Sequence, residues 1–489
     1  MTDALFLIWL KDSAALRCVL MEVGVKSGGV ETTRYLSSKG WASGNSDSPA
    51  NTHYAPAIVG GIKFTETLSL EGSASLSNGD IEISNFNGVR DSWLDDIWTS
   101  RSVNIYIGDA SWAKSDFRLV FSGVVSGIDS KNANSLNLKL GDKMQRLNTV
   151  VTEDKLLGST VNKDKLIPLC FGECHNISPL LVDATVNEYQ VHNGPIESII
   201  EVRDNGVPVL FTPYLLTGKF RLTSQPAGVI TCSVQGDKPS TYANDIASLI
   251  KRLAISYGQV GKKFLLAEID ATSFTTFATA HPQPVGLYLS DKANVLDCIS
   301  RLASSVGGRV LASRAGLLTI VKLSLPQATA GTTVTATNMV ERSLSLSQYP
   351  LVVAGVKLAY CRNYTVQAAL QTGIPAEHAA MFKEEWLTTT LTDATAALDY
   401  ITYTELPLQE TLLLVASDAS VEATRRLAMT STQRKVFKYT GLPSLMLEAL
   451  GNSQTIQHKR FGLTAGVTGQ IISIATDWLH PHVTIEVLI

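Results

Sequence analysis

Cysteine and charge are both scarce in this sequence. Six of the 489 residues are cysteine, scattered through the chain as Cys18, Cys170, Cys174, Cys232, Cys298 and Cys361. A disulfide framework belongs to short secreted chains, so this scatter predicts reduced, mostly buried thiols in a protein made in a cytoplasm. Charged residues make up only 17% of the chain, and this low fraction weakly indicates that neighbouring chains cover part of the surface.

Dense basic runs and long apolar runs are also missing. The formal net charge of -3, without a Lys/Arg cluster, argues against a broadly basic nucleic-acid binder. Residues 4–10 are apolar, but they are too few to span a bilayer, and Asp3 stands where a signal peptide needs basic residues. We therefore expect neither a membrane-spanning segment nor a secretory signal.

Motifs of common catalytic and cofactor sites are absent as well. The sequence contains no Gly-x-Ser-x-Gly nucleophile elbow, no phosphate loop and no Gly-x-Gly-x-x-Gly after a strand. It shows no repeat of about 20–50 residues, which argues against a propeller or a solenoid. We predict a protein that is not an enzyme, with no catalytic, cofactor-binding or metal-binding residues.

A two-residue hydrophobic period dominates residues 57–150. From Phe64 to Leu76 the even positions are mostly apolar and the odd positions are mostly Ser and Thr, which predicts one long strand with a wet face. Asn78-Gly79-Asp80 then predicts a turn into a return strand at 81–84. Further strands are expected at 103–107, 117–121 and 136–140, so this region is predicted to be an antiparallel meander.

The Ser/Thr face of residues 65–77 has two interpretations. It suits a wall that lines a hydrated channel, and it equally suits an ordinary solvated sheet face. Both interpretations stay open at this point.

The fold class is predicted to be mainly β with an α+β module, in several domains. Changes in the pattern of predicted strands, turns and helices divide the chain into four parts. They are an N-terminal β-barrel domain (1–150), a small β module (151–240), an α+β module (241–325) and a C-terminal β-rich domain (338–489), with a linker at 326–337. The α+β module is expected to be an insert of helices followed by a hairpin at 309–321.

Cap residues and apolar spacing predict three helices. One is capped by Asn244 or Asp245, and another begins near Ser290 or Asp291 and ends at Gly307-Gly308. The third covers residues 417–429, with Asp418 as its cap and Arg425-Arg426 facing water. Strands are expected at 199–202 and 207–211, joined as a hairpin by the turn Asp204-Asn205-Gly206. Further strands are expected at 351–360, 364–370 and 412–416, and at 435–439, 453–457, 467–475 and 483–489. The last of them is apolar and is expected to be held in a sheet.

Two groups of metal-ligand residue types occur. Cys170, Cys174 and His175 offer three ligands within six residues, but a structural zinc site normally needs four ligands. His480 and His482 flank a proline that marks a loop or an edge. Buried thiols beside a polar turn, and a loop entering the last strand, are the favoured interpretations.

Acidic residues beside tryptophans form the one pattern typical of a glycosidase cleft. Asp91, Asp95 and Asp96 lie close to Trp93 and Trp98, and such enzymes use a pair of carboxylates. Acidic residues near the start of a short helix explain the same pattern without catalysis, and we favour that explanation.

Three stretches occur in a recognisable order. The first is EVGV at 22–25 with VETTRYLS at 30–37 and YAP at 54–56, and the second is GDIEISNFNG at 79–88 with DSWL at 91–94. The third is LEALG at 447–451, followed by RFGL at 460–463, GQII at 469–472 and DW at 477–478. In this order they resemble tail-tip (baseplate) hub proteins of long-tailed bacteriophages, with Asn87 where Asp is more familiar.

This resemblance implies a structural role. Such hubs are homotrimers with two β-barrels per subunit and pseudo-sixfold symmetry, and they adapt the tail tube to the threefold tip. The implied partners are the distal tail protein, the tape-measure protein, tip or fibre proteins, and passing DNA without sequence-specific contacts. The implied place is the virion tail tip, assembled in the host cytoplasm, with a part in host attachment and genome ejection. The alternatives are a hexameric distal tail ring and a tail-tip glycan-binding protein or cell-wall hydrolase.

Overall fold

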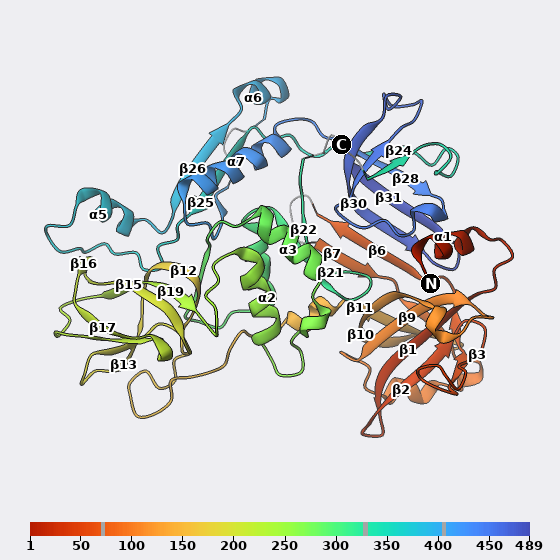
Figure 1. Cartoon of the computed structure of the whole chain (residues 1–489), viewed down its shortest axis with the longest axis horizontal. Helices are drawn as coiled ribbons and strands as arrows, with labels where there is room; N and C mark the ends of the chain where they lie inside the picture. The colour runs from red at the N-terminus through yellow and green to blue at the C-terminus, as the bar shows by residue number, and fades with distance from the viewer. Residues whose placement is uncertain (70–73, 326–330, 403–406) are drawn as a thin grey trace. The chain divides into compact units, whose positions relative to one another are not determined.

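The computed structural model describes residues 1–69, 74–325, 331–402 and 407–489 (Figure 1). It is mainly β, with 39% strand and 20% helix, as the sequence predicted. The chain forms two compact units that are both discontinuous in sequence. The first unit comprises Met1–Arg146, Arg309–Pro350 and Arg434–Ile489, and the second comprises Leu147–Gly308 and Leu351–Gln433. These units cut across the four expected segments, whose boundaries remain a prediction.

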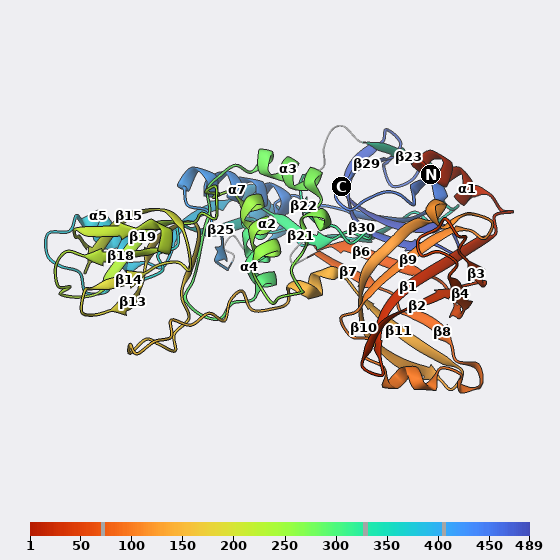
Figure 2. The same ribbon diagram turned by 60° about the horizontal axis from the view of Figure 1, so that its bottom comes forward.

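A nine-stranded sheet forms one half of the first unit, in the order β3-β4-β2-β1-β9-β10-β11-β8-β5 (Figure 2). Its strands are β1 (Arg17–Ser27), β2 (Val30–Ser37), β3 (Trp41–Ala42), β4 (His53–Pro56), β5 (Ile58–Val59), β8 (Ile81–Ser84), β9 (Ser102–Asp109), β10 (Arg118–Asn132) and β11 (Ser135–Gly141). Strands β9 to β11 confirm the predicted meander. The sheet order ends on β3 and β5, and the expected closed barrels are not found among the described residues.

The other sheet of the first unit joins the two ends of the chain. Its order is β23-β29-β30-β31-β28-β24, and β6 pairs with β30 on one side and with β7 on the other. The bounds are β6 (Lys63–Leu68), β7 (Ala74–Asn78), β23 (Thr332–Val334), β24 (Ser345–Gln348), β28 (Val436–Gly441), β29 (Ser453–Ile456), β30 (Val467–Asp477) and β31 (His482–Leu488). The last strand, β31, lies between β28 and β30, which confirms that the apolar terminus is held in a sheet.

The expected long strand at 64–76 is wrong. Strands β6 and β7 pair antiparallel with each other, so the chain reverses between them; residues 70–73 lie outside the described ranges. The expected return onto β8 is also wrong, because β8 pairs with β11 and β5. A two-residue period continues through both arms of a hairpin, so periodicity alone does not report the reversal.

The core of the first unit contains side chains from both sheets. Every second residue of β1 from Val19 to Val25 is buried, as are the apolar residues of β9 and β31. Helix α1 (Asp3–Lys11) adds Phe6 and Leu10, and the hairpin β21 (Gly308–Ala312) with β22 (Leu318–Lys322) adds Leu311. Residues 1–146 and 434–489 therefore share one core, whereas residues 351–433 belong to the second unit.

The second unit holds three small sheets. Their orders are β16-β15-β19-β12-β20, β13-β14-β18-β17 and β26-β25-β27. The strands are β12 (Leu169–Ile177), β13 (Leu180–Asp183), β14 (Glu188–Gln190), β15 (Ile196–Asp204), β16 (Val207–Pro208), β17 (Phe211–Tyr214), β18 (Lys219–Leu222), β19 (Ile230–Asp237), β20 (Gly286–Leu289), β25 (Gly355–Tyr360), β26 (Leu387–Thr392) and β27 (Gln409–Glu410). The predicted hairpin at Asp204-Asn205-Gly206 is confirmed by the pairing of β15 with β16.

Six helices are described in the second unit: α2 (Ile246–Ser256), α3 (Ala271–Ala280), α4 (Val295–Ser304), α5 (Ala376–Lys383), α6 (Ala394–Tyr400) and α7 (Ala416–Thr430). The Asp245 carboxylate caps α2 by accepting from the Ser248 backbone N–H at 2.9 Å, as predicted. Helix α4 begins later than expected, because Asn294 caps it through the Leu296 N–H. Gly307 follows α4 with a φ of +75°, as the helix end requires.

Helix α7 differs from its prediction in three ways. Its first residue is Ala416, so residues 412–416 are not a strand, and Val415 rather than Asp418 occupies the N-cap position. Arg425 and Arg426 do not simply face water, because both bind the buried carboxylate of Glu422, at 2.7 and 2.6 Å. Figure 1 shows α7 against β25, where Ala423 packs on Val356 and Leu358. Glu422 precedes the two arginines by three and four residues, the spacing at which side chains meet on a helix, and it is buried.

Replacing Ile299 tests the burial of α4. Ile299 is fully buried on the face that also carries Val295 and Leu302. We expect Ile299→Ala to lower the free energy of unfolding by about 2–5 kcal/mol, because it leaves a cavity in a core that relaxes only in part. Urea denaturation measures the change, with the exposed Lys292→Ala as the control. An Ile299→Ala protein as stable as the parent would show that this face is not buried.

The Glu422 cluster predicts a loss of stability in acid. Burial alone would raise the pKa of Glu422, but Arg425 and Arg426 more than offset that effect and lower it. A carboxylate with a lowered folded-state pKa stabilises the protein above its unfolded pKa, and this contribution disappears as the pH falls through the folded pKa. The stability difference between the parent and Glu422→Gln, from urea denaturation, should therefore be large at pH 7 and shrink as the pH falls below the ordinary Glu pKa of about 4.3. A difference that is independent of pH would contradict this assignment.

Candidate interaction surface

The segment between β8 and β9 is held in two short 3-10 helices, η1 (Phe86–Gly88) and η2 (Asp91–Asp95). Figure 2 shows this orange segment beyond the ends of β8 and β11. Asn87 and Gly88 have φ values of +56° and +71°, in the left-handed region. Asn enters that region more readily than most residues because its short polar side chain bonds locally, so Asn87 suits its place in this turn.

Asn85 fixes the start of this segment. Its side chain is 98% buried, its Nδ2 donates to Oδ1 of Asp91 at 2.7 Å, and its Oδ1 accepts from the backbone N–H of Arg90 at 2.8 Å. The Arg90 guanidinium in turn donates to the carbonyl of Ser84 at 2.6 Å. One buried amide thus ties the chain leaving β8 to the helix η2.

Arg34 of β2 fixes the other end. Its guanidinium forms an ion pair with Asp96 and lies over the ring of Trp93, 4.3 Å from the ring centroid. The indole N–H of Trp98 donates to the carbonyl of Trp93 at 2.7 Å, and Trp98 is buried in the core. Cation–π and charge-assisted bonds of this kind hold the segment against the sheet.

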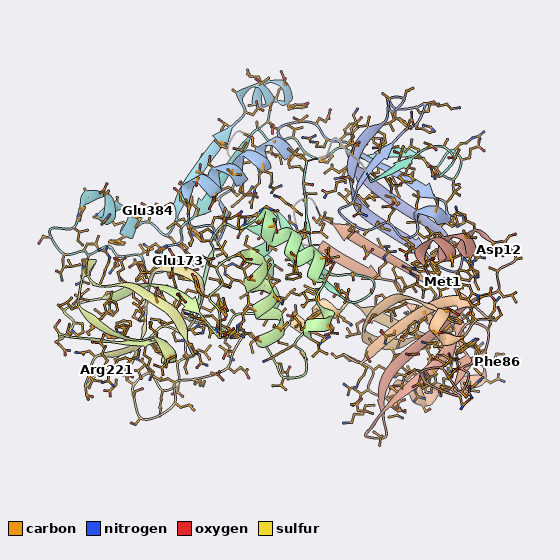
Figure 3. All side chains as sticks on the ribbon, in the orientation of Figure 1. Met1, Asp12, Phe86, Glu173, Arg221 and Glu384 are labelled. Atoms are coloured by element: carbon orange, nitrogen blue, oxygen red, sulfur yellow. The ribbon has the colours of Figure 1, made fainter. Side chains whose placement is uncertain are left out.

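This rigid segment presents apolar side chains to solvent. We call the set Phe86, Val89, Leu94 and Ile97 the apolar surface; their exposed fractions are 65%, 67%, 45% and 55%. Ile97 is joined to Lys26 of β1 by two backbone hydrogen bonds of 3.0 Å, so the surface is anchored to the nine-stranded sheet. Single exposed apolar residues are normal, whereas a cluster on a rigid platform is typical of a protein contact site. Figure 3 labels Phe86.

The three candidate acids of this segment do not act together in the structure. Asp91 accepts a hydrogen bond from Asn85, and Asp96 is neutralised by Arg34. Asp95 is exposed. Two of the carboxylates therefore have structural partners, and neither caps η2, whose N-cap residue is Arg90.

The candidate metal ligands are either buried as thiols or paired with other side chains or carbonyl groups. Cys170 and Cys174 are buried in the core of the second unit with Cys232, and burial raises the pKa of the Cys174 thiol well above its usual range. The Cys174 thiol therefore stays protonated, whereas a metal ligand is a thiolate. His175 instead lies 3.2 Å from the Glu173 carboxylate.

The His480 and His482 imidazoles have local partners as well. His480 Nδ1 is 3.5 Å from Asp477, and His482 Nδ1 is 3.0 Å from the carbonyl of His480. Among the described residues no group of three His, Cys, Asp or Glu side chains is placed to hold a metal ion. In the same ranges, no helix is long and apolar enough to cross a membrane.

Comparison with known proteins gives matches among solved structures alone. No protein-family model matches the chain, and no curated protein matches it. The 43 kDa tail protein of prophage MuSo2 from Shewanella oneidensis is 13% identical, with 96% of this chain and 98% of that chain covered and a TM-score of 0.40. The prophage tail protein gp18 of Listeria monocytogenes is 9% identical, with coverages of 95% and 94% and a TM-score of 0.41.

A tail protein from Neisseria meningitidis is 11% identical, with 96% of both chains covered and a TM-score of 0.36. The structural neighbours of this chain are phage tail proteins. This is the class of protein that the order of sequence stretches indicated. The stretch at 79–94 that carried part of the resemblance is also the segment that bears the apolar surface. Sequence reasoning missed the surface, although four large apolar residues in a turn-rich stretch without periodicity were a usable signal.

Replacing Asn85 tests how the apolar surface is held. We expect Asn85→Ala to lower the free energy of unfolding by about 1–3 kcal/mol, because it leaves the Arg90 N–H and the Asp91 carboxylate without their buried partner. Chemical denaturation measures this change, and the exposed Asn45→Ala is the matched control. Limited proteolysis should also cut residues 86–97 faster in Asn85→Ala. Equal cleavage of this variant and the parent would show that the amide does not fix the segment.

Proposed function

We propose that the protein is a structural component of a bacteriophage tail and that it is the tail-tip hub. The observation that carries the proposal is the apolar surface on a rigid sheet end, within the stretch that resembles such hubs. A soluble chain gains nothing from four exposed apolar side chains on an ordered platform unless a partner covers them. The low fraction of charged residues agrees with a chain that is largely enclosed by neighbours.

The construction of the first unit supports a load-bearing role. The pairing of β6 with β30 runs from Lys63 opposite Asp477 to Thr67 opposite Ser473, so an N-terminal and a C-terminal segment of the chain are held in one sheet. The second unit consists of two segments inserted into the sequence of the first, and the three segments of the first unit nevertheless form one compact unit.

A tail-tip hub works as part of a larger protein assembly. We infer a homotrimer that binds the distal tail protein, the tape-measure protein and tip or fibre proteins, and that lets DNA pass without sequence-specific contacts. In this role the protein adapts the tube to the threefold tip and takes part in host attachment and ejection. The proposed place is the virion tail tip, reached after assembly in the host cytoplasm.

The number of copies per tail separates the hub from the distal ring. Cryo-electron microscopy of purified particles should show three copies of this chain at the tail end. Six copies would replace the hub with the hexameric distal ring. The structural role also predicts no cell-wall cleavage, and cleavage of purified cell wall that Asp95→Ala or Asp96→Ala abolishes would overturn the non-enzymatic proposal.

Charging the apolar surface should block assembly without unfolding the chain. We expect the double variant Phe86→Asp/Val89→Asp to melt within a few degrees of the parent, because both side chains are exposed, but to enter particles at least tenfold less often. Incorporation is measured by complementing a tail that lacks this chain and quantifying the protein in purified particles. Val260→Asp, at a position 90% exposed in the second unit, is the control. Normal incorporation of the double variant would remove the apolar surface from the assembly contacts.

A further inference from the structure

Strand β26 (Leu387–Thr392) forms an open sheet edge in the second unit. It pairs antiparallel with β25 along its whole length, from Leu387 opposite Tyr360 to Thr392 opposite Gly355, without a register shift. No strand of the described residues pairs with its other side, because β26 ends the sheet order β26-β25-β27 (Figure 1). A regular edge as long as the strand itself is therefore available for pairing.

The ladder with β25 fixes which backbone groups of β26 face the open side. Just past the strand, the Asp393 N–H donates to the Ala354 carbonyl at 2.8 Å, so residue 393 points toward β25. Successive residues of an antiparallel strand direct their backbone groups to opposite sides. The odd-numbered residues of β26 therefore face β25, and the N–H and C=O groups of Thr388, Thr390 and Thr392 point away from it. No described residue forms a hydrogen bond with these outward groups.

This edge lacks the features that normally prevent the addition of another strand. Proteins protect exposed edges with charged side chains, prolines or bulges. Other edges of this chain follow that rule, since β16 contains Pro208, β17 contains Pro213 and β24 has a register shift. The sequence of β26 is LTTTLT, without charge or proline, and its Thr388 and Thr390 side chains are exposed. Such an edge accepts a strand unless something covers it.

The sequence of this edge is complementary to itself. Residues 387–391 read Leu-Thr-Thr-Thr-Leu, the same in both directions about Thr389. When two copies pair antiparallel about Thr389, Thr388 of one copy lies opposite Thr390 of the other. These residues have outward backbone groups, so each such pair exchanges two hydrogen bonds. Thr–Thr pairs across strands stabilise a sheet, and the same register places Leu387 opposite Leu391, where the two side chains bury apolar surface.

The acidic residues at the two ends of this register already have partners. Glu385 and Asp393 would lie opposite each other in the two copies. Glu385 pairs with Arg362 at 2.9 Å, and the Asp393 carboxylate accepts from the Ala396 N–H at 3.0 Å at the start of α6. Because each carboxylate is compensated within its own chain, the repulsion between the two copies is reduced.

We propose that two copies of the free chain pair through β26 about a twofold axis at Thr389. The contact is isologous, since both copies contribute the same residues, and it joins two β26-β25-β27 sheets into one continuous sheet. It covers the open edge while the chain is in solution, before any assembly. The pairing does not rest on the tail role, because a twofold contact is not part of a threefold ring.

Sedimentation velocity on the purified full chain tests the pairing. We expect a shift from monomer to dimer as the concentration of the parent is raised. The double variant Thr388→Lys/Thr390→Lys places lysine opposite lysine, so it should weaken dimerisation at least tenfold. Its melting temperature should match that of the parent, because both side chains are exposed. Thr241→Lys, at an exposed loop position of the second unit, is the control and should dimerise like the parent.

Two outcomes of this experiment would overturn the proposal. One is a parent chain that stays monomeric at every concentration, and the other is a lysine double variant that dimerises as well as the parent. The variant Phe86→Asp/Val89→Asp should keep the dimer, because the apolar surface lies in the first unit. Loss of the dimer in that variant would assign the contact to the apolar surface in place of β26.

Cysteine cross-linking locates the axis. In Thr389→Cys the two thiols lie opposite each other at a non-hydrogen-bonded pair, where Cβ atoms are about 4.5–5.5 Å apart and a disulfide needs only a small adjustment. Oxidised glutathione should therefore join two chains, since the two thiols lose two protons and two electrons and the glutathione disulfide is reduced to two thiols. Thr392→Cys, on the same strand but away from the axis, is the matched control and should stay uncoupled. Equal cross-linking of the two variants, or none of Thr389→Cys, would contradict this register.

Discussion

The first unit depends on one buried ion pair between distant parts of the chain. The Arg314 guanidinium lies 2.9 Å from the Glu66 carboxylate of β6, and it also donates to the carbonyls of Met446 and Glu448. The Arg314 carbonyl accepts from the Ser122 N–H of β10 at 2.8 Å. Burial raises the pKa of the Glu66 carboxyl, and Arg314 offsets part of that rise. Breaking such a pair leaves one charge buried alone, which costs roughly 3–5 kcal/mol. Arg314 therefore ties its own hairpin to β6, to β10 and to residues 446–448.

The hairpin that carries Arg314 needs its glycine. Gly316 has a φ of +77°, and a Cβ atom there would lie 2.8 Å from the carbonyl oxygen of Ser122. This close approach lets the turn of β21 and β22 lie on β10 and deliver the arginine to Glu66. The nine-stranded sheet and the sheet that joins the chain ends are thereby fixed to each other. Arg34 lies in the nine-stranded sheet, and Asn85 directly follows its strand β8; both residues hold the apolar surface in place.

The two proposed sites use the two units in different ways. The apolar surface is rigid, exposed and without charge, and these properties suit a permanent contact with a neighbouring chain. The β26 edge of the second unit is regular, neutral and open, and these properties suit a contact between two copies of the chain. The two sites share no residues, so substitutions can disrupt one site without changing the other.

Local patterns determined much of the secondary structure. The two-residue period predicted β9, β10 and β11, Asp245 predicted the start of α2, and Asp204-Asn205-Gly206 predicted a turn, because alternation, caps and left-handed turns act over a few residues. Tertiary structure alone decided the reversal between β6 and β7 and the pairing of β6 with β30. It also decided both candidate sites, since the sheet order leaves one edge of β26 open and the apolar surface at 86–97 depends on Arg34. Contacts between segments that far apart leave no periodic pattern in the sequence. They form when folding closes the long loops between the segments and buries their apolar side chains.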